Sequence, residues 1–331
     1  MSQSAERVWD FDAVQVGQSR PPVSVKVTLE DISRYARAVR NPNPVYHDPA
    51  AAARAGYRAV PAPPTMAFVY APSMRRAIAA HHGFIPLELA PVDPRQTPFA
   101  KCRITWYAPV HAGDTIISTT RVVDKYQRRG SKFVTLRTEA VDREGQAVLE
   151  YDYTCIFQYA QGQRPSEGQA PSGPAEGGEV SAPARPGRVD AASLEAGDPL
   201  PAFTITETQE TINAYAAVSL VEERNPRNIH TDAQFARRNI FGGTVNAGVA
   251  TMAYVCQMLE QCFPLSAFYN GGILELKATR PIRPGDTVTF SGQVTARRGV
   301  GELAVLECQV TGSNQRGELV AVSSATLVLG K

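Results

Sequence analysis

The sequence predicts an α+β protein made of two copies of one domain, each an antiparallel sheet wrapped around a central helix. The first observation is an internal repeat, because matching residues recur in the same order in both halves. The repeat pairs Ile32, Tyr35 and Ala36 with Ile212, Tyr215 and Ala216, and Pro109, Gly113 and Asp114 with Pro281, Gly285 and Asp286. The second observation is that each copy places apolar residues at helical spacing before runs rich in β-branched residues. Two copies are too few for a solenoid.

The composition is that of an ordinary globular protein. The chain has 331 residues, of which 43% are hydrophobic and 20% charged, with a net charge of +2. This length suits about two domains, and the small net charge gives no electrostatic case for a nucleic-acid partner. The five cysteines are scattered without metal-ligand spacing, so we expect free thiols in a reducing cytoplasm. The N-terminal segment is acidic where a signal peptide would be apolar, and no stretch reaches the length of a membrane span. We therefore expect a cytoplasmic protein with no membrane partner.

A linker separates the two copies. Residues 161–190 are rich in Gly, Pro, Ser and Ala and almost free of large apolar side chains. The sequence therefore predicts an N-terminal domain over residues 1–160 and a C-terminal domain over residues 191–331.

Each copy is predicted to begin with a short amphipathic helix. Thr28 and Asp31 form a capping-box pattern before the first apolar stripe, and Thr206 and Gln209 hold the matching places in the second copy. A longer apolar segment follows in each copy, and we expect it to be the buried central helix. These segments are residues 66–80, which contain Pro72, and residues 249–262.

Four runs with strand character follow each long segment. Their β-branched content and the Gly-Asp turns between them indicate an antiparallel meander. The runs are residues 104–110, 114–123, 132–141 and 147–158 in the first copy, and 274–282, 286–294, 303–310 and 320–330 in the second.

Two motifs in the second copy carry a resemblance to a known family. They read IHTDAQFAR at residues 229–237 and FGGTVNAG at residues 241–248. Together they resemble the hydratase motif of the MaoC-like, R-specific enoyl-thioester hydratases and dehydratases. Those proteins have the hotdog fold, and the longer ones are double hotdogs with a degenerate N-terminal half. The first copy, with NPNPVYHD at residues 41–48 and APPT at residues 62–65, is similar to that half.

The resemblance implies one working site, in the second copy. Adding water to a double bond conjugated with a thioester needs a base, a group that holds the water and donors for the enolate oxygen. His230 suits the base because imidazole titrates close to neutral pH. Asn225 stands where the family pattern usually has Asp. Because its side chain is an amide, it can orient water but cannot take its proton. Gly248, at the start of the central helix, would supply a backbone N–H and the positive end of the helix dipole.

The first copy lacks both catalytic elements. Tyr46 stands in place of the histidine, and Pro63 and Pro64 occupy the start of the helix, where proline has no N–H to donate. We therefore expect the first half to be a substrate-binding wall, with Tyr46 contributing to it. In the second copy we expect Asn246 to contact substrate, and Arg227 either binds a CoA phosphate or substrate carboxylate or belongs to a solvated loop.

Several alternatives stay open from the sequence alone. Glu222 or Glu223, in residues inserted before His230, either replaces the missing Asp as carboxylate partner or lies in a solvated loop. A hotdog thioesterase would use a carboxylate on the central helix, for which Glu260 is the candidate. A non-catalytic acyl-thioester-binding protein is the third alternative.

The resemblance also bears on ligands and partners. It implies an acyl-CoA or acyl-carrier-protein thioester as substrate, with no metal, nucleotide or flavin cofactor. The acyl group, whether short dicarboxylic, medium-chain or bulky, stays open. Pairing of two such chains into a homodimer is expected of the family.

Overall fold

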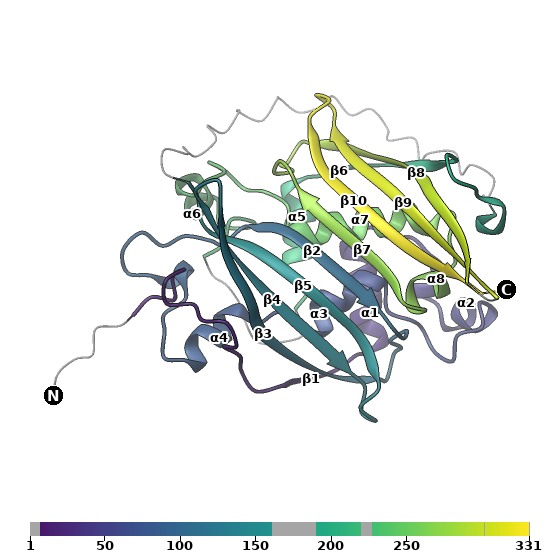
Figure 1. Cartoon of the computed structure of the whole chain (residues 1–331), viewed down its shortest axis with the longest axis horizontal. Coiled ribbons are helices and arrows are strands. Elements are labelled where there is room, and N and C mark those ends of the chain that lie inside the picture. The colour runs from purple at the N-terminus through teal and green to yellow at the C-terminus, as the bar shows by residue number, and fades with distance from the viewer. Residues whose placement is uncertain (1–6, 161–189, 220–226, 301, 331) are drawn as a thin grey trace.

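The computed structural model describes residues 7–160, 190–219, 227–300 and 302–330. Within them, ten strands form one antiparallel sheet in the order β1-β3-β4-β5-β2-β7-β10-β9-β8-β6 (Figure 1). The first half contributes β1 (Val23–Lys26), β2 (Phe99–Trp106), β3 (Thr115–Arg128), β4 (Ser131–Val141) and β5 (Ala147–Gln158). The second half contributes β6 (Pro199–Thr206), β7 (Gly272–Ala278), β8 (Thr287–Val300), β9 (Leu303–Asn314) and β10 (Leu319–Leu329). The antiparallel α+β class is confirmed.

The predicted meander holds for three strands of each half but not for the fourth. β3, β4 and β5 are consecutive neighbours, as are β8, β9 and β10, whereas β2 and β7 lie beyond the last strand of their own half. There they pair with each other from Lys101 opposite Lys277 to Trp106 opposite Gly272. This pairing makes one sheet of the two halves. The edge strands β1 and β6 were not predicted.

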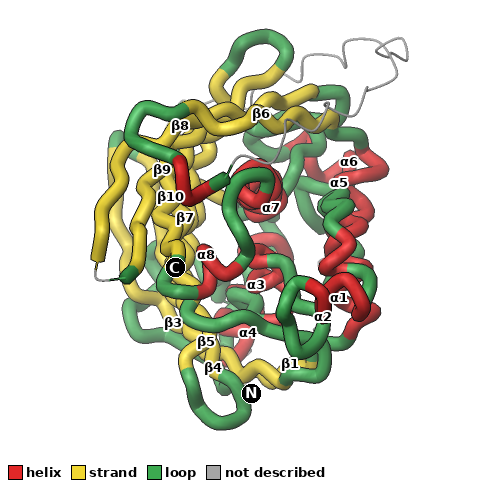
Figure 2. Tube along the Cα trace, turned by 90° about the vertical axis from the view of Figure 1, so that its right-hand side faces the viewer, coloured by secondary structure: helices red, strands yellow, loops and turns green. Residues whose placement is uncertain are grey.

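Helices cover one face of the sheet (Figure 2). The α-helices are α1 (Leu29–Ala38), α2 (Pro49–Arg54), α3 (Ala67–Tyr70), α4 (Arg75–His81), α5 (Gln209–Ala216), α6 (Ala233–Arg238), α7 (Gly248–Glu260) and α8 (Ser266–Tyr269). No helix in the described ranges is long and apolar enough to cross a membrane. The other face of the sheet is polar, and facing residues of alternating charge cross it from β4 to β7: Arg137, Asp152, Arg103 and Glu275.

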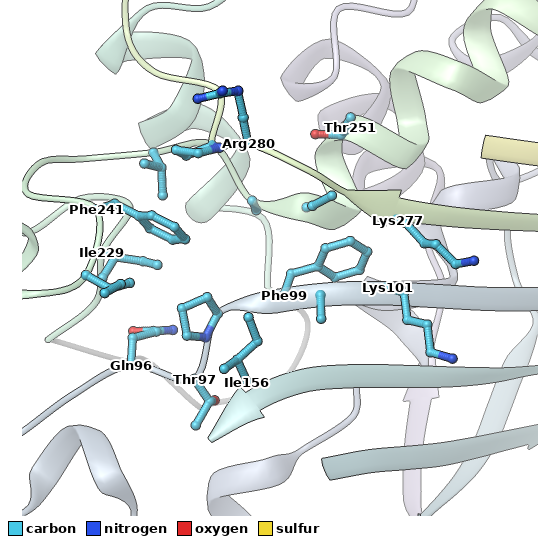
Figure 3. Close-up of a pocket in the computed structure, with 18 of the residues that line it drawn as sticks. Gln96, Thr97, Phe99, Lys101, Ile156, Ile229, Phe241, Thr251, Lys277 and Arg280 are labelled. Carbon is cyan, nitrogen blue, oxygen red and sulfur yellow. The ribbon is translucent and has the colours of Figure 1, made fainter. Parts of the chain in front are cut away.

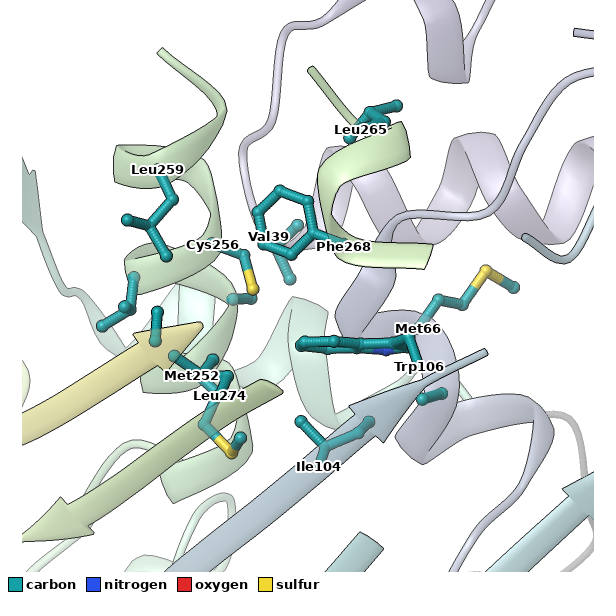
Figure 4. Close-up of a cluster of buried hydrophobic side chains, with 14 of the residues drawn as sticks. Val39, Met66, Ile104, Trp106, Met252, Cys256, Leu259, Leu265, Phe268 and Leu274 are labelled. Atoms are coloured by element: carbon teal, nitrogen blue, oxygen red, sulfur yellow. The ribbon is translucent and has the colours of Figure 1, made fainter. Parts of the chain in front are cut away.

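The core is shared between the halves. Trp106 of β2 packs edge-on against Phe268 of α8, with ring centroids 5.7 Å apart (Figure 4). Leu274 of β7 and Met252 of α7 belong to the same buried cluster. α7 is apolar on nearly all sides, and every residue from Ala250 to Leu259 is buried, as expected for a central helix.

The predicted long helix over residues 66–80 is wrong. The chain forms the short helix α3, leaves helical geometry at Ala71 and resumes as α4 only at Arg75. Pro72 explains the break, because proline lacks an N–H for the helical hydrogen bond and disfavours helical geometry in the residue before it. Met74 then takes a left-handed conformation, with φ of 47°.

The two predicted helix starts have different outcomes. Thr28 caps α1 through the expected capping box with Asp31, which confirms the first start. The second is wrong, because α5 is capped by Thr208 with Thr211 as its partner. Thr206 is instead the last residue of β6, where it faces Thr287 of β8. Strand pairing therefore moves the start of α5 two residues along the chain.

Truncation of the shared core should destabilise the whole protein. Phe268 is fully buried, so Phe268→Ala removes a ring from the contact with Trp106 and leaves a cavity. We expect the free energy of unfolding to fall by about 3–5 kcal/mol. Tyr107→Ala is the control, because that ring is 43% exposed. Urea unfolding of both variants measures the difference, and equal effects would contradict a shared core.

Candidate active site

A cavity of about 630 Å³ lies where the two halves meet (Figure 3). The second half contributes three of the predicted site residues to its lining, His230, Asn246 and Gly248, together with Thr251 of α7. The first half contributes the segment Gln96–Lys101, which leads into β2. The β2–β7 pairing ends at Lys101 and Lys277, and residues from both sides of that end line the cavity. The cavity is therefore built at the point where the two central strands part.

His230 sits on a turn that fixes its backbone. Its N–H donates to Asn228 Oδ1 at 2.8 Å, and the same oxygen accepts from the N–H of Thr231. The neighbouring residue, Ile229, is buried and accepts a hydrogen bond from the N–H of Val245 at 3.1 Å. The turn is thus fastened both to itself and to the segment that leads into α7.

The imidazole of His230 is held in one tautomer. Nδ1 lies 2.9 Å from the carbonyl oxygen of Val245. Because a carbonyl only accepts, Nδ1 carries the proton and Nε2 keeps its lone pair. Burial lowers the pKa of His230 below its usual 6.5, and the hydrogen bond to Val245 offsets only part of that. The ring is therefore neutral at neutral pH, the form that a general base requires.

Gln209 is a site residue that the sequence did not reveal. As the first residue of α5, it donates from Nε2 to the backbone carbonyl of His230 at 2.8 Å. Its Oε1 accepts from the Thr244 hydroxyl at 2.6 Å. One amide therefore joins the His230 turn to the segment before α7. Its sequence position suggested only a helix cap, because the partner lies 21 residues away.

The start of α7 is open to the cavity. Its N-cap residue, Ala247, offers no side-chain cap, so the backbone N–H groups of the first turn keep the positive end of the helix dipole available. The Phe99 ring of the first half packs directly on Gly248, since a Cβ there would lie 2.2 Å from Phe99 Cδ1. The glycine is thus required by the close approach of the other half. Beside it, Asn246 Nδ2 donates to Thr251 Oγ1 at 3.3 Å.

The cavity lining changes in character from one part to another. Apolar and aromatic side chains come from both halves: Pro98, Phe99, Phe133, Tyr153, Ile156 and Tyr159 from the first, and Ile229, Ile240, Phe241, Val245, Val249, Ile282 and Val320 from the second. Basic residues also contribute: Lys101 and Lys277 are partners on neighbouring strands, and Arg128 and Arg280 lie further along the lining. Of these, Lys277 pairs with Glu275 at 3.5 Å and Arg280 with Glu318 at 3.6 Å. Among the lining residues that the structure describes, none is acidic. The site therefore suits a ligand with an apolar part and an anionic part.

Comparison with known proteins accounts for both halves. Residues 14–151 match the sequence model described as the FAS1-like dehydratase domain region, and residues 192–314 match that of the MaoC-like domain. The chain belongs to the MaoC-like family of double-hotdog proteins. The predicted family and fold are therefore confirmed. The two matched ranges lie on either side of the predicted linker, 161–190, of which residues 161–189 lie outside the described part of the chain.

Two relatives match slightly less than half of the chain. A UPF0336 protein of Saccharopolyspora erythraea is 34% identical over 147 residues, which is 44% of this chain and 90% of that protein. A UPF0336 protein of Streptomyces avermitilis is 36% identical over 141 residues, 42% of this chain and 89% of that protein.

Solved structures share the fold over nearly the whole chain. A MaoC-like dehydratase has a TM-score of 0.69 at 20% identity, covering 96% of this chain and 98% of its own. A putative MaoC domain protein dehydratase from Chloroflexus aurantiacus has a TM-score of 0.68 at 15% identity, covering 100% and 99%. A conserved hypothetical protein from Mycobacterium tuberculosis, which has a double hotdog fold, has a TM-score of 0.60 at 16% identity, covering 97% of this chain and 99% of its own.

Other predicted site residues of this MaoC-like protein lie elsewhere. Tyr46, expected in the binding wall, is fully buried in the core that the two halves share and does not line the cavity. The first half contributes to the cavity wall through its strands instead, with Phe133, Tyr153 and Ile156 among the lining residues. Arg227 is exposed and also absent from the lining. Asn225, Glu222 and Glu223 lie outside the described residues, so their roles stay predictions.

Tyr46 lies instead near the carboxyl group of Glu260. Glu260, the last residue of α7, accepts a hydrogen bond from Asn41 Nδ2 at 3.1 Å. Burial raises the pKa of Glu260 to about 7, although the hydrogen bond from Asn41 acts in the opposite direction. Burial and the nearby Glu260 carboxylate together raise the pKa of Tyr46. This cluster joins the two halves at the end of α7 opposite Gly248.

Gly248→Ala should damage the site through a steric clash. The new methyl group would meet the Phe99 ring, so either the ring or α7 must move. We expect a loss of about 1–3 kcal/mol of stability. The control is Gly299→Ala in β8, where a Cβ meets nothing within 4 Å. Urea unfolding of both variants tests this, and equal stability of the two would refute the clash.

Glu260 should make stability depend on pH. Its pKa rises from 4.5 to about 7 on folding, so the folded protein favours the protonated acid. The associated stability is fully present below pH 4.5 and is lost as pH rises through 7. When the pH rises from 5 to 8, the free energy of unfolding of the native chain should therefore fall by on the order of 1–3 kcal/mol more than that of Glu260→Gln, because glutamine does not titrate. Urea unfolding at both pH values measures this, with the exposed Glu302→Gln as control. A parallel pH profile for Glu260→Gln would contradict the assignment.

Proposed function

We propose that the protein adds water to, or removes it from, the 2,3 bond of an acyl thioester, with His230 as the base. The observation that carries the proposal is the arrangement around one cavity. His230 has its Nδ1 fixed on the Val245 carbonyl, which leaves Nε2 as the proton acceptor, and the uncapped start of α7 lines the same space. A base and an oxyanion donor are two of the three elements that the reaction needs.

The proposed hydration follows from these groups. His230 Nε2 takes a proton from water while the water oxygen bonds to C3, and the π electrons move through C2 toward the thioester oxygen. The N–H of Gly248 and the helix dipole of α7 stabilise the resulting enolate. C2 then takes up a proton from the imidazolium, and the thioester carbonyl is restored. Since one imidazole both removes and returns the proton, oxygen and hydrogen add to the same face. Dehydration is the reverse.

The lining suggests how the substrate lies. The basic residues, among them Lys101 and Lys277, suit the phosphates that both CoA and acyl-carrier protein attach to the pantetheine arm. The apolar side chains of the first half suit the acyl group, as expected for a binding wall. A second hollow of about 240 Å³ shares Thr97, Tyr153 and Val249 with the cavity and reaches Pro72. The break between α3 and α4 therefore adds space for the acyl chain.

The site offers less support for a thioesterase. Such an enzyme would need a carboxylate beside the thioester, and Glu260 is at the far end of α7, where it does not line the cavity. A binding protein without turnover remains an outcome of the experiment below. The homodimer and the cytoplasmic location remain predictions, and the identity of the acyl group stays open.

The test is hydration of a panel of 2-enoyl-CoA thioesters, followed by the loss of the conjugated-thioester absorbance. We expect His230→Ala to lower kcat by about 10²–10⁴-fold while thioester binding persists. The exposed His81→Ala at the end of α4 is the matched control. In the native protein, the acid limb of kcat/KM should have its midpoint below pH 6.5, because the pKa of His230 is lowered. Binding without turnover across the panel would show a binding protein instead.

A further inference from the structure

Arg40 has a backbone conformation that few arginines adopt. It follows α1 at the position where the chain turns left-handed, with φ of 57°. The N–H of Asn41 bonds to the carbonyl of Ala36 at 2.8 Å, and that of Arg40 to Arg37 at 2.9 Å, the pattern of a Schellman helix end. Glycine is the usual residue there because a Cβ is strained. A side chain that is kept at this position needs compensating contacts.

Those contacts are in the other half of the molecule. The Arg40 guanidinium donates to Glu207 Oε1 at 2.7 Å, to the Tyr254 hydroxyl at 3.1 Å and to the carbonyl oxygen of Thr206. The side chain of Glu207 is only 1% exposed. A carboxylate so deeply buried is stable as an anion only when it is paired and hydrogen-bonded. Arg40 of the first half is thus the counterion of a buried acid in the second.

Glu207 links the helix that carries Gln209 to the helix that carries Gly248. Its Oε1 also accepts from the hydroxyl of Tyr254, which lies on α7, the helix that begins at Gly248. Its Oε2 accepts from Thr211 Oγ1 at 2.9 Å, in the first turn of α5. One carboxylate therefore joins the first turn of α5 to the middle of α7.

The path from Glu207 to the base is short. Gln209 follows two residues later and donates to the His230 carbonyl, while it accepts from Thr244. Val245, next along the chain, accepts from the imidazole of His230. Each step is a hydrogen bond or one or two residues of chain, so a shift of Glu207 would move His230 relative to α7.

We propose that Arg40 is a positioning residue for the hydratase site, and that it sets the distance between His230 and the start of α7 through Glu207 and Gln209. This rests on the function proposed above. The first half would then contribute to catalysis itself and not only to substrate binding, although it touches no reacting atom. A displacement of about 1 Å between base and substrate is enough to cost on the order of 10²-fold in rate.

The test compares three full-length proteins with the native chain. Arg40→Gln removes the counterion. The double variant Arg40→Gln with Glu207→Gln replaces the pair by two amides and leaves no unpaired buried charge, so it protects against simple misfolding. Two contacts still hold the segment beside Arg40 on α7: Gln257 to the Val39 carbonyl at 2.8 Å, and Asn41 to Glu260. The control is Arg34→Gln, because Arg34 is exposed on α1 and pairs with Asp31 in the same helix.

The measurements are kcat and KM on the enoyl-CoA that the native protein hydrates fastest, the NMR titration of the His230 imidazole, and the folded fraction by circular dichroism. For both Arg40 variants we expect kcat per folded molecule to fall about 10- to 100-fold, with KM changed less than about threefold. The midpoint of the His230 titration should move, and Arg34→Gln should match the native chain throughout.

Three results would overturn the proposal. They are native kcat with a native His230 titration, a rise in KM at constant kcat, and a loss of activity that only follows the folded fraction. If the native protein hydrates no thioester, the proposed function fails and the titration alone decides on Arg40. A shifted midpoint then supports its positioning of His230, and an unchanged one refutes it.

Discussion

The pairing of β2 with β7 is the interaction on which the rest of the structure depends. Six residue pairs, from Lys101 and Lys277 to Trp106 and Gly272, turn two sheets into one. The continuous sheet lets one hydrophobic core extend beneath both halves, and the residues of α7 from Ala250 to Leu259 are buried. The site follows from the same pairing, because the cavity forms where the two strands part. The pairing also brings Phe99 of the first half against Gly248 of the second.

At that cavity, burial and hydrogen bonding change the pKa of His230 in opposite directions. Removal from water favours the neutral imidazole of His230, whereas the Val245 carbonyl stabilises the proton on Nδ1. The hydrogen bond fixes the proton on Nδ1, and burial disfavours a second proton on Nε2. The ring is therefore neutral, with a defined tautomer. The two buried acids, Glu207 and Glu260, also differ in their partners. Glu207 keeps Arg40 as counterion, while burial raises the pKa of Glu260, which accepts from Asn41.

Local patterns in the sequence predicted a large part of this arrangement. The Thr28 capping box, the all-round apolar α7 and the association of His230 with Gly248 each depend on neighbours in sequence or on a contiguous motif. The parts that were missed depend on tertiary contacts. Tyr46 matches His230 in the repeat but is drawn into the core, and Gln209 gains its role from a distant carbonyl. Pro72 was recognised within the predicted helix, yet only the structure shows that the chain becomes helical again no earlier than Arg75.

The shared cavity has a consequence for stoichiometry. His230 and the start of α7 come from the second half, whereas Phe99, Tyr153 and other lining residues come from the first, so neither half alone forms the whole cavity. Two separate polypeptides would have to find each other in equal amounts, and their affinity would set how many sites exist. A single chain carries one of each at a high effective concentration, whatever the expression level. The fusion therefore makes the number of sites equal to the number of molecules.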